Sequence, residues 1–156
     1  MSTATDHDST RRTALGPATI AQLLAAVAVL AGGLLHLRDW NDEKKDLPSQ
    51  IPGVWVVQEG FLLNVAASLV LAALLVATAF GALRAVRRFV IPAALGLQLV
   101  SIAALVLSRG SGIFGWQEKG AGYQDRAGQV LGVEIVAVVL LVVPFALTYA
   151  GTRRTD

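Results

Sequence analysis

Between Arg126 and Arg153 the chain runs AGQVLGVEIVAVVLLVVPFALTYAGT, and Glu134 is the only charged residue in this interval. A helix needs about 20 mostly apolar residues to cross a bilayer core of about 30 Å, so the interval is long enough to span a membrane. It lacks the alternation of apolar and polar residues that is typical of membrane barrel strands. A helix is the remaining structure that satisfies every backbone hydrogen bond inside lipid.

Three more apolar intervals without charge precede this one. They lie between Arg12 and Arg38, between Glu59 and Arg84, and between Arg88 and Arg109. Together the four intervals predict spans at about 15–37, 55–82, 89–108 and 127–150. The first is longer than the apolar region of a cleaved signal peptide, so we expect it to remain as a span.

The expected fold is all-α, a four-transmembrane-helix bundle that forms one membrane domain over residues 13–152. Short connections favour an up-down-up-down arrangement of the helices. Residues 1–12 are polar and are expected to form a mobile cytoplasmic tail.

The composition supports a membrane protein and excludes several other classes. The chain is 54% hydrophobic and 15% charged, whereas soluble domains carry about 25% charged residues. This excludes a soluble enzyme and a disordered chain. The net charge of +2 comes from scattered basic residues, so no basic groove is available for nucleic acid. Cysteine is absent, which excludes disulfides, iron–sulfur clusters and cysteine nucleophiles.

Basic residues beside the spans predict the orientation of the protein in the membrane. Segment 84–88 contains Arg84, Arg87 and Arg88 and no acid, whereas segments 38–54 and 109–126 mix bases with acids. Connections rich in arginine and lysine tend to stay in the cytoplasm. We therefore expect both termini in the cytoplasm, with the two mixed segments outside.

Glu134 and His36 are the strongest candidates for a functional site, because an ionisable residue inside a span is costly. At 1.5 Å per residue, Glu134 lies roughly 10 Å below the outer end of the fourth span. It is interpreted as a metal ligand, a proton relay or a ligand counter-charge, or as a structural acid bonded to a neighbouring helix. His36, near the outer end of the first span, could bind a metal, titrate, or bond to a backbone carbonyl.

Glu59 and Glu118 are expected at the same outer end as His36 and Glu134. One histidine with two or three carboxylates suits a divalent metal, so His36, Glu134 and Glu118 are candidate metal ligands. Their spacing gives no support, because each comes from a different segment. His7, the only other histidine, lies in the predicted cytoplasmic tail, which excludes a bis-histidine haem within one subunit. Any other cofactor is left open.

Polar residues occur at helical spacing within two of the spans. Asn64 and Ser68 lie in the second span, and Gln98 and Ser101 lie in the third. Small and polar residues hold membrane helices together, which is one interpretation. The other is a polar path, for which Asn64 and Gln98 are candidate ligand- or proton-binding residues. No Ser–His–Asp arrangement is recognisable in the sequence.

Trp116 is a candidate ligand-binding residue in the segment between the third and fourth spans. It shares the predicted outer side with Trp40 and Trp55. The three side chains form either an aromatic belt at the headgroup level or part of a cap over a pocket, built from segments 38–54 and 109–126.

Five short patterns carry a resemblance to known proteins. They are His36-Leu37, Ile51-Pro52-Gly53, GFLLN at 60–64, GIFGWQE at 112–118, and Glu134. With these the chain resembles a group of small four-span bacterial integral membrane proteins without an assigned function. Its similarity to the DoxX-like four-helix proteins is one of architecture alone. The resemblance implies a multi-pass protein of the bacterial plasma membrane and implies no chemistry.

These observations favour a non-catalytic plasma-membrane protein whose outer end binds a small ligand, an ion or a partner subunit. The first alternative is a proton-linked transporter or channel component that uses Glu134. The second is a membrane enzyme acting on a lipid or a quinone. The lipid bilayer is the expected partner in every case, and a homo-oligomer or a larger membrane complex is left open.

Overall fold

The computed structural model of the protein describes residues 15–83, 85–118 and 126–152, which form four long helices. These are α1 (Pro17–Asp39), α2 (Val54–Ala79), α3 (Arg87–Arg109) and α4 (Arg126–Thr152), and the π-helical turn η1 (Trp40–Lys44) continues α1. No strand occurs within these ranges. Each long helix is apolar enough to cross a membrane, which confirms the expected all-α chain with four spans. The predicted tail at 1–12 lies outside the described residues.

The first helix extends past the end that its hydropathy predicted. The apolar interval stops at Leu37, but helical structure continues through η1 to Lys44. Two contacts support the extension: the Arg38–Asp42 ion pair, with 3.7 Å between Nε and Oδ2, and a hydrogen bond of 2.8 Å from Lys45 Nζ to Asn41 Oδ1. Charged residues spaced four apart stabilise a helix in water. The charges therefore mark the edge of the apolar interval and not the end of the helix.

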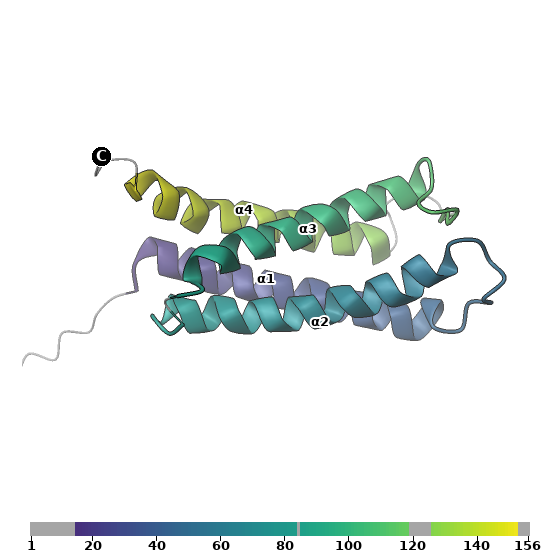
Figure 1. The fold of residues 1–156 in the computed structure, drawn as a ribbon, viewed down its shortest axis with the longest axis horizontal. Helices are drawn as coiled ribbons and strands as arrows, with labels where there is room; N and C mark the ends of the chain where they lie inside the picture. The colour runs from purple at the N-terminus through teal and green to yellow at the C-terminus, as the bar shows by residue number, and fades with distance from the viewer. Residues whose placement is uncertain (1–14, 84, 119–125, 153–156) are drawn as a thin grey trace, which may run out of the picture.

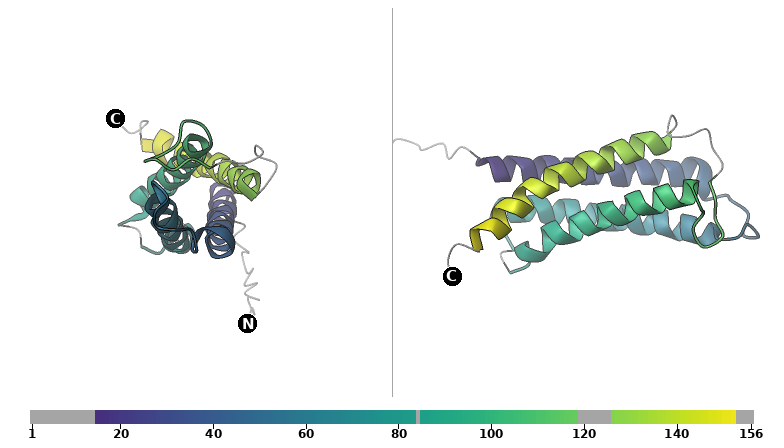
Figure 2. Two further views of the ribbon diagram at one scale, coloured as in Figure 1. Left: turned by 90° about the vertical axis from the view of Figure 1, so that its right-hand side faces the viewer. Right: turned by 90° about the horizontal axis from the view of Figure 1, so that it is seen from above.

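The helices lie lengthwise beside one another as a bundle (Figure 1). Seen end-on, they surround a common axis (Figure 2), with α1 packed on α2 and α4, and α3 packed on the same two helices. Segments 40–53 and 110–118 lie at one end of the bundle, here called the loop end, and residues 80–83 and 85–86 lie at the other. Helices α2 and α3 diverge toward the loop end (Figure 1).

Small apolar side chains form the core in the half of the bundle away from the loop end. Ala25 and Val29 of α1, Leu75 of α2, Ala94 of α3 and Ala137 of α4 are fully buried there. On the outside, large apolar side chains are exposed on all four helices, including Val27, Leu63, Val100 and Val139. This outer surface is suited to contact with acyl chains.

A second apolar cluster closes the loop end. Trp116 packs with Val54 and Val57, and Ile51 and Ile113 pack against them. Trp116 belongs to a tight turn in which Ile113 and Trp116 exchange two backbone hydrogen bonds of 2.8 Å. We call segments 47–57 and 110–118, which meet in this cluster, the cap.

Gly53 is the point of closest approach inside the cap. Its φ of +73° favours glycine, and a Cβ there would lie 2.6 Å from the carbonyl oxygen of Phe114 and from the backbone nitrogen of Trp116. No other residue fits both the conformation and the contact. The Ile51-Pro52-Gly53 segment therefore packs directly against the turn that carries Trp116.

Candidate functional site

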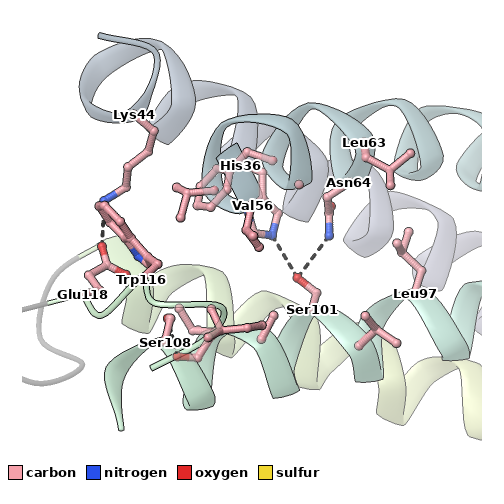
Figure 3. A pocket seen from close by; sticks show the side chains of 17 residues that line it. His36, Lys44, Val56, Leu63, Asn64, Leu97, Ser101, Ser108, Trp116 and Glu118 are labelled. Carbon is pink, nitrogen blue, oxygen red and sulfur yellow. Dashed lines mark hydrogen bonds and ion pairs between the residues drawn. The ribbon is translucent and has the colours of Figure 1, made fainter. Parts of the chain in front are cut away.

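A cavity of about 240 Å³ lies in the loop-end half of the bundle, between α2 and α3 (Figure 3). Trp116 of the cap lines it at the loop end, and His36, Asn64 and Ser101 line it deeper in the bundle. The rest of the lining is mostly apolar, from Val56, Val57, Gly60, Phe61, Leu63, Leu97, Val100, Ala104, Leu105 and Ile113. The cavity therefore has polar groups at its two ends and an apolar wall between them.

The cavity reaches the outer surface of the bundle between α2 and α3. Leu63 and Val100 both line it, yet they are 71% and 68% exposed. Gly60 lines it as well, and a Cβ on Gly60 would meet no atom within 4 Å. In a bilayer this opening would face acyl chains.

Four helices contribute side chains to a hydrogen-bonded network at the deep end. His36 Nε2 lies 2.9 Å from Glu134 Oε1 and 3.2 Å from Ser101 Oγ. Ser101 Oγ donates to Glu134 Oε1 and accepts from Asn64 Nδ2 at 3.1 Å. Ser68 Oγ donates to Asn64 Oδ1 at 3.2 Å. Glu134 is only 1% exposed, so this acid depends on protein partners in place of water.

The histidine ring meets two partners at one nitrogen. His36 Nε2 lies within hydrogen-bond distance of both Glu134 Oε1 and Ser101 Oγ, so the carboxyl and the hydroxyl group share this position on the ring. The ring also makes an edge-to-face contact with Phe61, at 4.9 Å between centroids. His36 Nδ1 and Glu134 Oε2 are buried and have no hydrogen-bond partner in the part of the chain that the structure describes.

A serine, a histidine and an acid do meet, although no such arrangement is recognisable in the sequence. Three different helices supply them, which is why no motif was visible. The geometry differs from that of a nucleophilic triad, in which the acid binds Nδ1 and the serine binds Nε2. Here the acid and the serine both face Nε2, and Ser101 Oγ also contacts Glu134 Oε1. The three side chains therefore link three helices in an arrangement other than that of the triad.

Charged side chains line the loop end of the cavity (Figure 3). Lys44 Nζ lies 2.7 Å from Glu118 Oε1, and Arg109 Nε lies 3.8 Å from Glu118 Oε2. Lys44 is 7% exposed, and its ammonium group is 6.0 Å from the centroid of Trp116. Because the charges are paired, they can lie beside an apolar wall without an uncompensated charge.

The sequence-predicted residues divide between the cavity and its surroundings. His36, Asn64, Trp116 and Glu118 line the cavity, and Glu134 supports His36 from behind. Glu59 is exposed and does not line it. Trp116 is buried, which favours its expected role in closing a pocket over a place in an aromatic belt at the headgroup level. Trp55 is exposed.

Gln98 is buried beside the network and does not line the cavity. Its Oε1 has no partner among the described residues, and a Cβ on Gly32 would lie 4.0 Å from it. The expected polar path is thus formed only in part, because hydrogen bonds join Asn64, Ser68 and Ser101 without Gln98.

The candidate metal site is not assembled as expected. His36 and Glu134 are in contact, but Glu118 pairs with Lys44 at the other end of the cavity. Within the described ranges no three His, Cys, Asp or Glu side chains form a group that could hold a metal ion. His36 and Glu134 meet because α1 packs on α4, whereas Glu118 follows α3 and reaches Lys44 at the loop end.

Lys44 was missed as a site residue, and Ser101 was considered only as part of the possible polar path. Lys44 lies eight residues after His36, so it falls on the same helical face once α1 is known to continue through η1. Ser101 and Ser108 line the cavity seven residues apart, which is also a helical repeat. That spacing was the available signal. Comparisons with protein-family models, curated proteins and solved structures found no match for this chain.

Proposed function

We propose that the protein is an integral membrane protein of the bacterial plasma membrane that binds a small ligand without catalysing a reaction. The binding site is the cavity at the loop end of an up-down-up-down bundle. Both termini lie in the cytoplasm and the loop end faces outside, as the arginines of segment 84–88 favour.

One observation carries the proposal: a cavity with a lipid-facing mouth ends on a buried polar network. Ligand sites are mostly apolar pockets with a few polar groups that orient the ligand. Here Leu63 and Val100 at the mouth line the same cavity as His36 and Ser101. A binding function also accounts for the cap, because Gly53 and Trp116 close the cavity at the loop end.

Gly60 offers a direct test of this function. A phenylalanine there has space for its Cβ and narrows the cavity, because Gly60 lines it. Gly96 on α3 has the same open surroundings and does not line the cavity, so Gly96→Phe is the matched control. Both glycines lie within long helices.

The three proteins are purified from bacterial membranes in mild detergent, and the small molecules bound to them are extracted and quantified by mass spectrometry. We expect a molecule that accompanies the wild type and Gly96→Phe, and is depleted about tenfold in Gly60→Phe, equivalent to about 1.4 kcal/mol. Circular dichroism checks that all three remain helical. Identical extracts from all three proteins would contradict the proposal.

Proton-linked transport is the second candidate, favoured by the buried contact of His36 with Glu134. A transport path would also have to cross the apolar core around Val29 and Leu75 to reach Gln22 and Thr78, which bond to each other at 2.8 Å. A proton-flux assay in liposomes distinguishes the two functions. Transport predicts a flux that Glu134→Gln abolishes, whereas a binding protein gives no flux in either form.

A further inference from the structure

The charges around the cavity limit the kind of ligand that it can hold. The ionisable residues that line it are His36, Lys44 and Glu118. His36 contacts Glu134 at 2.9 Å, and Lys44 contacts Glu118 at 2.7 Å. A charged head group would bring a further charge out of water and find every charged side chain in the lining already paired, which is unfavourable. The cavity therefore favours a neutral ligand.

The deep end offers a hydrogen-bond donor to such a ligand. Ser68 fixes the amide of Asn64 by donating to its Oδ1, so Nδ2 faces Ser101 and the cavity. An amide nitrogen has two N–H donors. Among the described residues Nδ2 donates only to Ser101 Oγ. The second N–H suits an oxygen acceptor on a ligand.

The position of this donor selects lipids whose head group can lie below the membrane surface. Ser101 is eight residues from Arg109, the last residue of α3, which places it about 12 Å along the helix. Phosphate-bearing head groups stay at the surface, whereas a neutral oxygen-bearing head group can lie at this depth. The mouth beside Leu63 and Val100 then lets the tail pass into the acyl chains.

We infer that the ligand is a neutral lipid whose head group presents a carbonyl or hydroxyl oxygen to Asn64. This inference rests on the ligand-binding function proposed above and names the class of ligand. The tail lies along the apolar wall between α2 and α3, and the head group lies beside Ser101.

Native mass spectrometry of the full-length protein in detergent tests the inference with five probes of similar chain length. They are hexadecanol, methyl tetradecyl ketone, hexadecane, hexadecanoate and hexadecylammonium. We expect the alcohol, the ketone or both to bind about tenfold more tightly than the alkane and the two ions. Binding should be lost in Gly60→Phe and kept in Gly96→Phe. The alcohol and the ketone separate a head group that donates a hydrogen bond from one that only accepts.

Asn64→Leu tests the N–H donor of Asn64 by comparing probes within one variant, so the result does not depend on how tightly that variant binds lipids in general. This variant should bind the alcohol or ketone no better than the alkane, because the N–H donor is gone while the apolar volume is kept. Retained alkane binding shows that the variant is folded. An unchanged preference for the oxygen-bearing probe would overturn the role of Asn64.

The outcomes separate this inference from the proposed function. Tighter binding of an ion, or equal binding of the alkane, at a site that Gly60→Phe blocks would overturn the neutral oxygen-bearing class and leave the binding function standing. Failure of every probe to bind, together with identical extracts from the Gly60 and Gly96 variants, would overturn both.

Discussion

A single hydroxyl joins the helices at the deep end of the cavity. Ser101 Oγ on α3 contacts His36 of α1, Asn64 of α2 and Glu134 of α4. Lipid tails are as apolar as the helix surfaces, so helices in a membrane have no hydrophobic reason to associate, and such contacts stabilise the bundle. We therefore expect Ser101 to contribute to stability as well as to the shape of the cavity.

Replacing Ser101 with alanine should lower the free energy of unfolding by about 1 kcal/mol, a typical value for a polar contact between membrane helices. Ser108→Ala is the control, because Ser108 is also buried but donates only to the Leu105 carbonyl of its own helix, at 2.9 Å. A titration with dodecyl sulfate, followed by circular dichroism, measures both. Equal losses in the two variants would show that the contacts between helices at Ser101 add nothing.

The sequence predicted individual residues of the site better than their partners. His36 and Glu134 stood out because a titratable group inside an apolar interval is visible without any knowledge of the fold. Their contact with each other depends on how α1 and α4 are rotated about their axes. The serines were recognised only by their helical spacing, which a contact between helices and a polar path share, so the partners of Ser101 were not predictable.

At the scale of the elements, two adjacent glycines on α1 have different surroundings. A Cβ on Gly33 would lie 2.6 Å from the Cβ of Ser68, so the backbone of α1 closely approaches α2 here. A Cβ on Gly32 would have its nearest neighbour, Val133, at 3.9 Å, which is ordinary contact. Gly33 alone sets the spacing of α1 and α2 next to the network.

Alanine substitution of these glycines should therefore have opposite effects. Gly33→Ala forces α1 and α2 apart and should cost about 1–3 kcal/mol of unfolding free energy, the usual cost of overpacking. Gly32→Ala should be neutral or stabilising by up to about 1 kcal/mol, because alanine favours a helix over glycine. The same dodecyl sulfate titration compares them. A loss at Gly32 as large as that at Gly33 would contradict the close approach.

The positions of the four spans were predictable because hydropathy and charge act locally along the chain. The ends were less so: α1 was expected to stop near residue 37, and it continues through η1 to Lys44. This extension placed Lys44 on the cavity wall and Glu118 beside it. The two further helical turns thus supply Lys44, the partner with which Glu118 forms an ion pair.

At the scale of the whole molecule, polar side chains are concentrated at three levels of the bundle. The Lys44–Glu118 pair lies at the loop end, the network around Ser101 lies deeper, and the contact of Gln22 with Thr78 lies near the opposite end. The apolar core cluster lies between the last two levels along all four helices. The two ends of the bundle therefore differ in chemistry, and the cavity lies in the loop-end half. The orientation in the membrane therefore decides which leaflet supplies the ligand.

Reporter fusions test this orientation. A phosphatase that works only outside the cytoplasm should be active when fused at Asp46, in the loop-end segment, and a cytoplasmic fluorescent reporter should be active at Arg154. The reason is that Arg84, Arg87 and Arg88 are expected to hold the connection between α2 and α3 in the cytoplasm. Replacing these three with alanine should reduce the phosphatase signal at Asp46, whereas replacing Arg109 and Arg126 should not. A cytoplasmic signal from Asp46 in the unmodified chain would reverse the orientation, and the cavity would then draw its ligand from the inner leaflet.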